Sequence, residues 1–243
     1  MLSHLQFPDH ELMSANTADI IADTIKADPS LVLCMASGHT PARTCELLVE
    51  KILNQGIDHS RLSFIGLDEW VGLPGNNEGS CRYFFEHKIF SPLQMDPSQY
   101  HLFDALSNDL ESELRKMDRF ILKKGIDLMV VGIGMNGHIG FNEPGTPFTS
   151  LCHVADLDEI TTSVGQKYFK EVTTLSRGIT VGLGHLMNAR HLILIANGAR
   201  KAGVVQRALE GPVDPSFPAS IVQRHENVTI ITDFEAASLL GKS

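Results

Sequence analysis

Short runs of apolar and β-branched residues alternate with longer stretches of helical periodicity along most of the chain, which is typical of βαβ units. The stretch DLMVVGIG, at residues 127–134, is almost continuously apolar, which indicates a strand buried on both faces. The candidate strands are residues 31–36, 62–67, 100–103, 126–132, 178–182, 191–196 and 228–232. The candidate helices lie near residues 11–26, 41–54, 80–90, 109–124 and 199–210. The pattern predicts an α/β fold, an open, mostly parallel, twisted sheet with helices on both faces.

Composition narrows the class of protein. A chain of 243 residues with 43% hydrophobic residues and no repeat or linker-like stretch is expected to fold as a single domain, residues 1–243. Its net charge of −9 argues against nucleic-acid and anionic-membrane partners, which require a basic surface. No signal segment or membrane-spanning run is apparent, and four widely spaced cysteines indicate free thiols, so we expect a cytoplasmic protein.

The loop after the first predicted strand contains small and hydroxyl-bearing residues, in the order Ser37, Gly38, His39, Thr40 and Pro41. Small residues let a ligand approach the backbone closely, and proline suits the first turn of a following helix. Free N–H groups at a helix N-terminus bind phosphate readily. An ordinary strand-to-helix turn has a similar composition, so this loop alone leaves both interpretations open.

Paired acidic residues, Asp68 and Glu69, follow the second predicted strand beside the chain's single tryptophan, Trp70. A carboxylate at a strand end can transfer a proton when its surroundings adjust its pKa. In the structural interpretation, Asp68 caps a turn and Glu69 faces solvent. Without further context, these residues favour the structural interpretation.

A third loop, GIGMNGHIGFNEPG at residues 132–145, contains the spacing G-x-G-x-x-G. A dinucleotide-binding loop of this kind opens a helix and usually follows the first strand. Here the loop comes mid-chain and ends in Pro-Gly, so we expect no dinucleotide cofactor. The better interpretation is a glycine-rich loop that exposes His138 and Glu143. A carboxylate bound to one imidazole nitrogen fixes the tautomer and leaves the other nitrogen for proton transfer.

Metal and serine-hydrolase chemistry fit the sequence less well. A zinc site made from His138, Glu143 and another histidine is conceivable, but the chain has no HExxH pair and no His/Cys cluster at ligand spacing, so no metal is predicted. It also lacks the G-x-S-x-G turn of α/β hydrolases.

Taken in order, the segments SGHTP, LDEWVGLP, GIGMNGHIGFNEPG and RGITVGLGHLMNAR resemble those of the glucosamine/galactosamine-6-phosphate isomerase (deaminase) family over nearly the whole chain. GHIGFNEP is the specific motif, because the sister 6-phosphogluconolactonases usually follow this histidine with a threonine-rich stretch. The resemblance implies a Rossmann-like fold of the sugar-phosphate isomerase type. It also implies an enzyme that converts glucosamine or galactosamine 6-phosphate to fructose or tagatose 6-phosphate plus ammonia, without cofactor or metal. A sugar-lactone hydrolase and a non-catalytic sugar-phosphate sensor are the alternatives.

The resemblance further implies a role for each matching position. Asp68 is the base that moves a proton between C2 and C1 of the opened sugar, and His138, oriented by Glu143, opens the pyranose ring. The SGHTP loop binds the phosphate together with Lys201 of the NGARKAG segment. Lys167, in the segment QKYF, falls where many relatives place an arginine on a mobile lid.

Two departures from the family pattern affect these expectations. Many relatives have aspartate where this chain has Asn136, whose amide can orient a neighbour but cannot stabilise an imidazolium by charge. We therefore expect an active enzyme with an altered pH profile. Allosterically activated hexameric relatives place basic residues after the NEP motif, where this chain reads SLCHVADLD, which argues against such activation.

The segment LDEWVGLPGNNEGSC and the C-terminal ITDFEAASLLGKS resemble the galactosamine-6-phosphate group slightly more than the glucosamine enzymes. Family members range from monomers to hexamers, so the expected state is a monomer or a homo-oligomer. The expected partner is a small-molecule amino-sugar phosphate.

Overall fold

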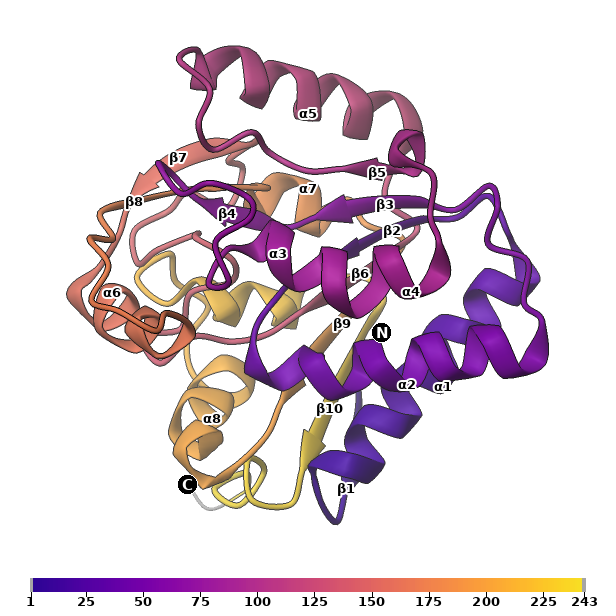
Figure 1. The fold of residues 1–243 in the computed structure, drawn as a ribbon. Coiled ribbons are helices and arrows are strands. Elements are labelled where there is room, and N and C mark those ends of the chain that lie inside the picture. Colours follow the sequence, from indigo (N-terminus) through magenta and orange to yellow (C-terminus); the bar gives the residue numbers. More distant parts are fainter. Residues whose placement is uncertain (1, 242–243) are drawn as a thin grey trace.

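Seven parallel strands form the central sheet, in the spatial order β1-β10-β9-β6-β2-β3-β5 (Figure 1). A computed structural model describes residues 2–241 of the chain. Every pair of neighbouring strands in this sheet runs parallel, which confirms the predicted α/β class. The strands are β1 (Leu2–Phe7), β2 (Val32–Met35), β3 (Ser63–Gly66), β5 (Tyr100–His101), β6 (Leu128–Val131), β9 (His191–Ala196) and β10 (Val228–Asp233).

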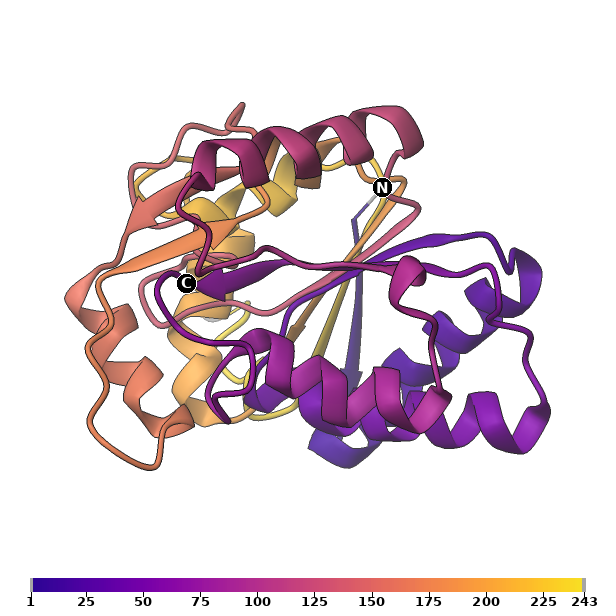
Figure 2. The same ribbon diagram turned by 45° about the horizontal axis from the view of Figure 1, so that its top comes forward.

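Helices cover both faces of the sheet (Figure 2). One face packs against α1 (His10–Ala27), α2 (His39–Gln55), α3 (Cys81–Phe85) and α4 (Ser91–Leu93). The other face packs against α5 (Leu110–Lys124), α7 (Leu183–Met187) and α8 (Ala202–Glu210). A further helix, α6 (Glu159–Gly165), lies outside these two layers. Short turns of π or 3-10 helix complete the chain: η1 (Glu86–Phe90), η2 (Pro97–Gln99), η3 (Gln166–Tyr168), η4 (Ala199–Lys201) and η5 (Pro218–Arg224).

Alternate residues of the central strands enter opposite hydrophobic cores. In β2, Val32 and Cys34 pack into the core that α5 covers, whereas Leu33 and Met35 pack into the core that α1 and α2 cover. This alternation follows from the two-residue period of a strand. All four side chains are buried, as are the four of β6. The prediction of strands buried on both faces is therefore confirmed.

A second, three-stranded antiparallel sheet lies beside the first, with the order β4-β8-β7. Its strands are β4 (Asp68–Trp70), β7 (His153–Asp156) and β8 (Arg177–Thr180). The strand predicted at residues 178–182 does form, but it pairs with β4 and β7 instead of joining the parallel sheet. Short strands of this kind carry few apolar residues, and β4 and β7 therefore gave no signal in the sequence.

One residue, Leu67, joins the two sheets. Its backbone N–H donates to the carbonyl of Met35 in the parallel sheet, and its carbonyl accepts from the N–H of Val181, just beyond β8. The chain thus turns from β3 into β4 at Leu67. Asp68 is the first residue beyond this corner.

The topology brings two of the candidate loops together. From β2 at the centre, the chain first adds β3 and β5 on one side and then crosses to place β6 on the other side. The loops that follow β2 and β6 therefore leave neighbouring parallel strands at the same sheet edge. Open α/β sheets bind their ligands at such a switch point, beyond the carboxyl ends of the strands.

Other expectations can be compared with the structure directly. The four cysteines Cys34, Cys45, Cys81 and Cys152 are buried free thiols, as expected. Within residues 2–241, no helix is both long and apolar enough to cross a membrane.

Candidate active site

The SGHTP loop forms the expected turn from β2 into the N-terminus of α2. Gly38 has φ +117°, a conformation that suits glycine, and no side chain caps the helix in the described structure. The N–H of Thr40 therefore remains available to a ligand, whereas that of His39 faces the Tyr168 hydroxyl and Pro41 has none. The Thr40 hydroxyl donates to Asn197 at 2.7 Å, which ties this loop to the one after β9. Ser37 and His39 complete the loop, and His39 is exposed.

Three cationic side chains, those of Lys201, Lys167 and Arg200, lie near one another. Lys201 donates from Nζ to the carbonyl of Ile133, at the start of the glycine-rich loop. Burial, together with the positive charge of Lys167, lowers the pKa of Lys201 to about 8. Burial and the charge of Arg200 likewise lower the pKa of Lys167. An anion bound among these cations would relieve their repulsion, so the arrangement suits a phosphate group.

Asp68 lies where the chain enters β4, and its carboxylate is only partly exposed. The Cys81 thiol donates to Oδ1 at a sulfur–oxygen distance of 3.4 Å. Burial raises the pKa of Asp68, the Cys81 hydrogen bond lowers it, and the charge of Glu69 raises it. The net result is a pKa of about 7. A carboxylate that titrates near neutral pH is suited to act as a general base.

The structural interpretation of the acidic pair is wrong for both residues. Glu69 does not face solvent: it is 4% exposed, and its carboxylate accepts the backbone N–H groups of Trp70, Cys81 and Arg82 at 2.8–2.9 Å. Glu69 therefore caps the start of α3, where a negative charge is favourable. Asp68 accepts from a thiol and caps no turn. Because the chain turns into β4 at Leu67, Glu69 is buried, whereas in a simple loop it would face solvent.

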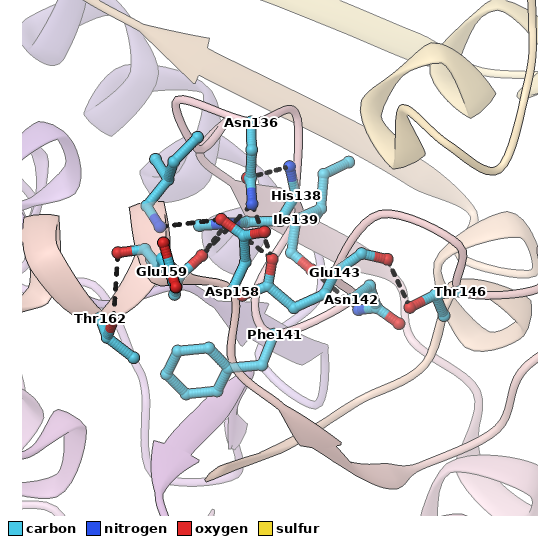
Figure 3. Close-up of polar contacts among 12 residues, drawn as sticks. Asn136, His138, Ile139, Phe141, Asn142, Glu143, Thr146, Asp158, Glu159 and Thr162 are labelled. Carbon is cyan, nitrogen blue, oxygen red and sulfur yellow. Dashed lines mark hydrogen bonds and ion pairs between the residues drawn. The ribbon is translucent and has the colours of Figure 1, made fainter. Parts of the chain in front are cut away.

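Asn136, His138 and Glu143 converge within the glycine-rich loop (Figure 3). The Asn136 amide donates to Oε2 of Glu143 at 2.8 Å, and its oxygen accepts the backbone N–H of His138 at 3.2 Å. The Nδ1 atom of His138 lies 3.6 Å from Oε2 of Glu143. Burial raises the pKa of Glu143, but the facing His138, Thr161 and Asn136 outweigh this effect and lower it overall. Glu143 is therefore ionised at neutral pH.

The glycines of this loop serve the imidazole and not a dinucleotide. A Cβ atom on Gly134 would lie 2.3 Å from Nε2 of His138, so only glycine lets the ring lie this close to the backbone. Gly137 has φ +86°, which again suits glycine. In the described chain no helix begins within residues 132–145, whereas a dinucleotide-binding loop would open one.

Sequence reasoning missed three residues that contact these groups. Thr161, on α6, places Oγ1 2.9 Å from Nδ1 of His138. The Cys81 thiol contacts Asp68 and also hydrogen-bonds to the Ser37 side chain. The hydroxyl of Tyr168 would lie 3.0 Å from a Cβ atom on Gly38, so Tyr168 covers the SGHTP loop. Cys81 ends the segment LDEWVGLPGNNEGSC and Tyr168 belongs to QKYF, but no pattern within these segments indicates the contacts, which only the fold creates.

Contacts link the separate loops into one site. The Cys81 thiol bridges Ser37 and Asp68, which joins the SGHTP loop to the acidic residue. The backbone N–H of Phe141 donates to Oγ1 of Thr180 at 3.2 Å, and Thr180 pairs in register with Asp68. The predicted catalytic and phosphate-binding residues therefore line one edge, where the two sheets meet.

One cluster of potential metal ligands, Asp118, Cys152 and His185, lies on other elements. Asp118 accepts from Nε2 of His185 at 2.7 Å and from the backbone N–H of Cys152 at 3.0 Å. Burial and the neighbouring Asp118 raise the pKa of the Cys152 thiol, so it does not become a thiolate ligand readily. The cluster is best described as a hydrogen-bonded link between α5, α7 and the start of β7.

Comparison with known proteins places these features in a family. Residues 10–231 match the family described as glucosamine-6-phosphate isomerases/6-phosphogluconolactonase. The glucosamine-6-phosphate deaminase of Bacillus pumilus is 38% identical over 237 residues, which cover 97% of this chain and 98% of the relative. The corresponding enzyme of Rhodopirellula baltica is 39% identical, with 97% and 94% covered.

Solved structures agree with this assignment. A monomeric glucosamine-6-phosphate deaminase superimposes with a TM-score of 0.93 at 34% identity, covering 98% of this chain and 99% of that one. The 6-phosphogluconolactonase of Trypanosoma brucei has a TM-score of 0.82 at 19% identity, with 99% of each chain covered, and shares the fold alone. The chain therefore belongs to the glucosamine-6-phosphate isomerase/6-phosphogluconolactonase family.

Proposed function

We propose that this protein is an amino-sugar 6-phosphate deaminase that converts glucosamine 6-phosphate, or its C4 epimer galactosamine 6-phosphate, to the ketose 6-phosphate and ammonia. The observation that carries the proposal is the pairing of two proton-transfer groups at one sheet edge. Asp68 titrates near neutral pH, and His138 presents an imidazole on the neighbouring loop. The similar proteins from Bacillus pumilus and Rhodopirellula baltica, and the similar solved structure, are glucosamine-6-phosphate deaminases, which supports the same activity.

The phosphate end of the substrate is held by the N-terminus of α2. The N–H groups at its start donate to the phosphate oxygens, Ser37 lines the same loop, and Lys201 and Lys167 supply positive charge. This end of the sugar does not react. Its binding energy positions C1 and C2 against the proton-transfer groups.

His138 opens the ring of the bound sugar. Nε2 removes the proton of the C1 hydroxyl and delivers a proton to the ring oxygen as the C1–O5 bond breaks. Glu143 stabilises the imidazolium that forms between these two transfers, and Asn136 holds Glu143 in place. Asn136 has no charge of its own, so it orients His138 and Glu143 but does not supply the negative charge that an aspartate at this position would.

Asp68 then carries out the isomerisation. Its carboxylate removes the proton from C2 of the open aldehyde and returns it to C1, through an enolamine. The product is an imine at C2, and water adds to this carbon to release ammonia and leave the ketone. The aldehyde oxygen gains one proton to become the C1 hydroxyl and the nitrogen loses one to become the imine, so the protons balance and no oxidant or reductant is consumed.

Ammonia release tests the proposal. Purified protein is incubated with glucosamine 6-phosphate, with galactosamine 6-phosphate and with 6-phosphogluconolactone, and ammonia and lactone hydrolysis are measured. We expect ammonia from at least one epimer and no acceleration of lactone hydrolysis. Rapid lactone hydrolysis without ammonia would assign the chain to the lactonase alternative, and substrate binding without any turnover would assign it to the sensor alternative.

The oligomeric state can be proposed from the similar structure. Because the deaminase with a TM-score of 0.93 is described as monomeric, we infer that this chain is also a monomer. Light scattering at the concentration of the activity assay measures the mass directly. A mass of twice 26.7 kDa or more would contradict the inference.

A further inference from the structure

Thr161, and not Glu143, is the nearer partner of the His138 imidazole. Its Oγ1 lies 2.9 Å from Nδ1, whereas Oε2 of Glu143 lies 3.6 Å from the same atom. Thr161 is 4% exposed, so water does not compete freely for these positions. The Asn136 amide nitrogen lies 3.4 Å from the same hydroxyl, and Thr161 helps to lower the pKa of Glu143.

The hydrogen-bonding capacity of a hydroxyl fixes the direction of these contacts. A hydroxyl has one proton to donate and two lone pairs to accept. The Asn136 amide nitrogen can only donate to it, and the ionised Glu143 can only accept from it. Nδ1 of His138 faces this hydroxyl at 2.9 Å and Oε2 of the ionised Glu143 at 3.6 Å. A proton on Nδ1 can be donated to the hydroxyl and is attracted by the carboxylate, so the Nδ1–H tautomer is favoured and Nε2 is left unprotonated.

We propose that Thr161 is a positioning residue that holds His138 in the Nδ1–H tautomer and connects it to Glu143, so that Nε2 faces the sugar as a base. This role rests on the ring-opening function proposed above for His138. Thr161 does not touch the reacting atoms and keeps its own proton throughout.

The segment that carries Thr161 contacts both the glycine-rich loop and the phosphate-binding loop. Thr161 lies on α6, whose first turn, with Asp158, Glu159 and Thr162, packs beside Asn136 and His138 (Figure 3). Asp158 caps this turn by accepting the backbone N–H of Ile160 at 2.8 Å. The same segment continues directly into η3, which carries Lys167 and Tyr168 to the phosphate-binding loop. One segment therefore serves both ends of the substrate.

Three variants separate the hydroxyl of Thr161 from its shape. Thr161→Val keeps the branched side chain and removes the hydroxyl, and Thr161→Ser keeps the hydroxyl and removes the methyl group. Thr162→Val makes the same chemical change one residue away, where the hydroxyl donates to the carbonyl of Glu159 and contacts none of the catalytic groups.

Steady-state kinetics on the accepted amino-sugar phosphate form the first measurement. Since general acid–base catalysis contributes about 10²- to 10⁴-fold, losing its alignment in Thr161→Val should lower kcat by about 10- to 100-fold with KM changed by less than about twofold. Thr161→Ser should recover most of the rate, and Thr162→Val should match the unaltered protein. A Thr161→Val enzyme with unchanged kcat, or a Thr161→Ser enzyme equally impaired, would overturn the proposal.

Nitrogen-15 NMR of the imidazole forms the second measurement and does not depend on turnover. The unaltered protein and Thr161→Ser should show one Nδ1–H tautomer of His138, and Thr161→Val should show a mixture. A single unchanged tautomer in Thr161→Val would overturn the positioning role even if catalysis had fallen.

A third measurement isolates ring opening and separates this inference from the proposed function. In Asp68→Asn the isomerisation is blocked, and the exchange of the two sugar anomers, followed by NMR, reports ring opening alone. We expect this exchange to be accelerated by Asp68→Asn protein and to slow when Thr161→Val is added. Absence of any acceleration would contradict the role of His138, whereas acceleration unaffected by Thr161→Val would contradict only the role of Thr161.

Discussion

The ionisation of Asp68 determines the acid side of the pH profile that we predict. A general base acts only in its ionised form, and burial raises the pKa of Asp68 to about 7. The ionised fraction is then about one half at pH 7 and about one tenth at pH 6, so kcat/KM, which reports the ionisation of the free enzyme, should fall about tenfold for each further pH unit. A carboxylate with an ordinary pKa, about 3.9, would lose no activity in this range.

The Cys81 thiol gives a way to move this midpoint. Its hydrogen bond to Oδ1 lowers the pKa of Asp68, against the larger effect of burial. Removing the thiol in Cys81→Ala should therefore move the midpoint to higher pH. A weak neutral hydrogen bond of about 0.5 kcal/mol corresponds to about 0.4 pH unit. Cys81→Ser keeps a donor, so its midpoint should stay at or below that of the unaltered protein.

The assay is the initial rate of ammonia release at substrate concentrations well below KM, where the rate reports kcat/KM, measured between pH 5 and 9. The substrate phosphate also titrates, at about pH 6, but it does so equally for every variant. The comparison between Cys81→Ala and Cys81→Ser therefore isolates Asp68. A profile of the unaltered protein that stays flat down to pH 5 would refute the raised pKa. Equal midpoints for both variants would refute the contribution of the thiol.

Three further substitutions separate the roles at the site. Asp68→Asn should lower kcat by about 10²- to 10⁴-fold. It should also raise the free energy of unfolding at pH 8 by about 1–3 kcal/mol, measured in denaturant titrations. The raised pKa means that the ionised Asp68 destabilises the folded protein above pH 7, and this destabilisation disappears as the pH falls and the carboxylate takes up a proton. His138→Gln should abolish enzyme-catalysed anomer exchange, measured by NMR, while sugar-phosphate binding measured by calorimetry persists. Lys201→Ala should mainly raise KM, and KM of the unaltered protein should rise above pH 8, where Lys201 loses its charge, whereas that of the variant should not.

The central sheet could be predicted from the sequence because its signal is local and repeated. The strand predicted at residues 191–196 matches β9 at both ends, and five of its six side chains are buried. The edge strand β1 was missed because most of its residues are exposed and its sequence, LSHLQF, mixes polar and apolar residues. A strand that is stabilised mainly by hydrogen bonds to its neighbour lacks the apolar pattern from which strands are predicted.

Some residues of the site could likewise be predicted from local sequence, and others could not. The SGHTP loop and the glycine-rich loop could be recognised because a phosphate-binding helix N-terminus and a close backbone approach each need particular residues within a few positions. Thr161 and Cys81 could not, because their contacts to His138 and Asp68 cross 23 and 13 residues of sequence. The burial of Glu69 was missed for a related reason, since its three backbone donors belong partly to α3.

The two proton-transfer groups are held by different parts of the fold. Asp68 follows the corner at Leu67, whose backbone hydrogen bonds reach Met35 and Val181, so both sheets fix its position. His138 lies on a glycine-rich loop, and its nearest partner, Thr161, belongs to the seven-residue helix α6. A short helix outside the two packed layers is stabilised by fewer contacts than a strand between two cores. Substitutions on the surface of α6 should therefore impair ring opening before they impair the transfer of the C2 proton.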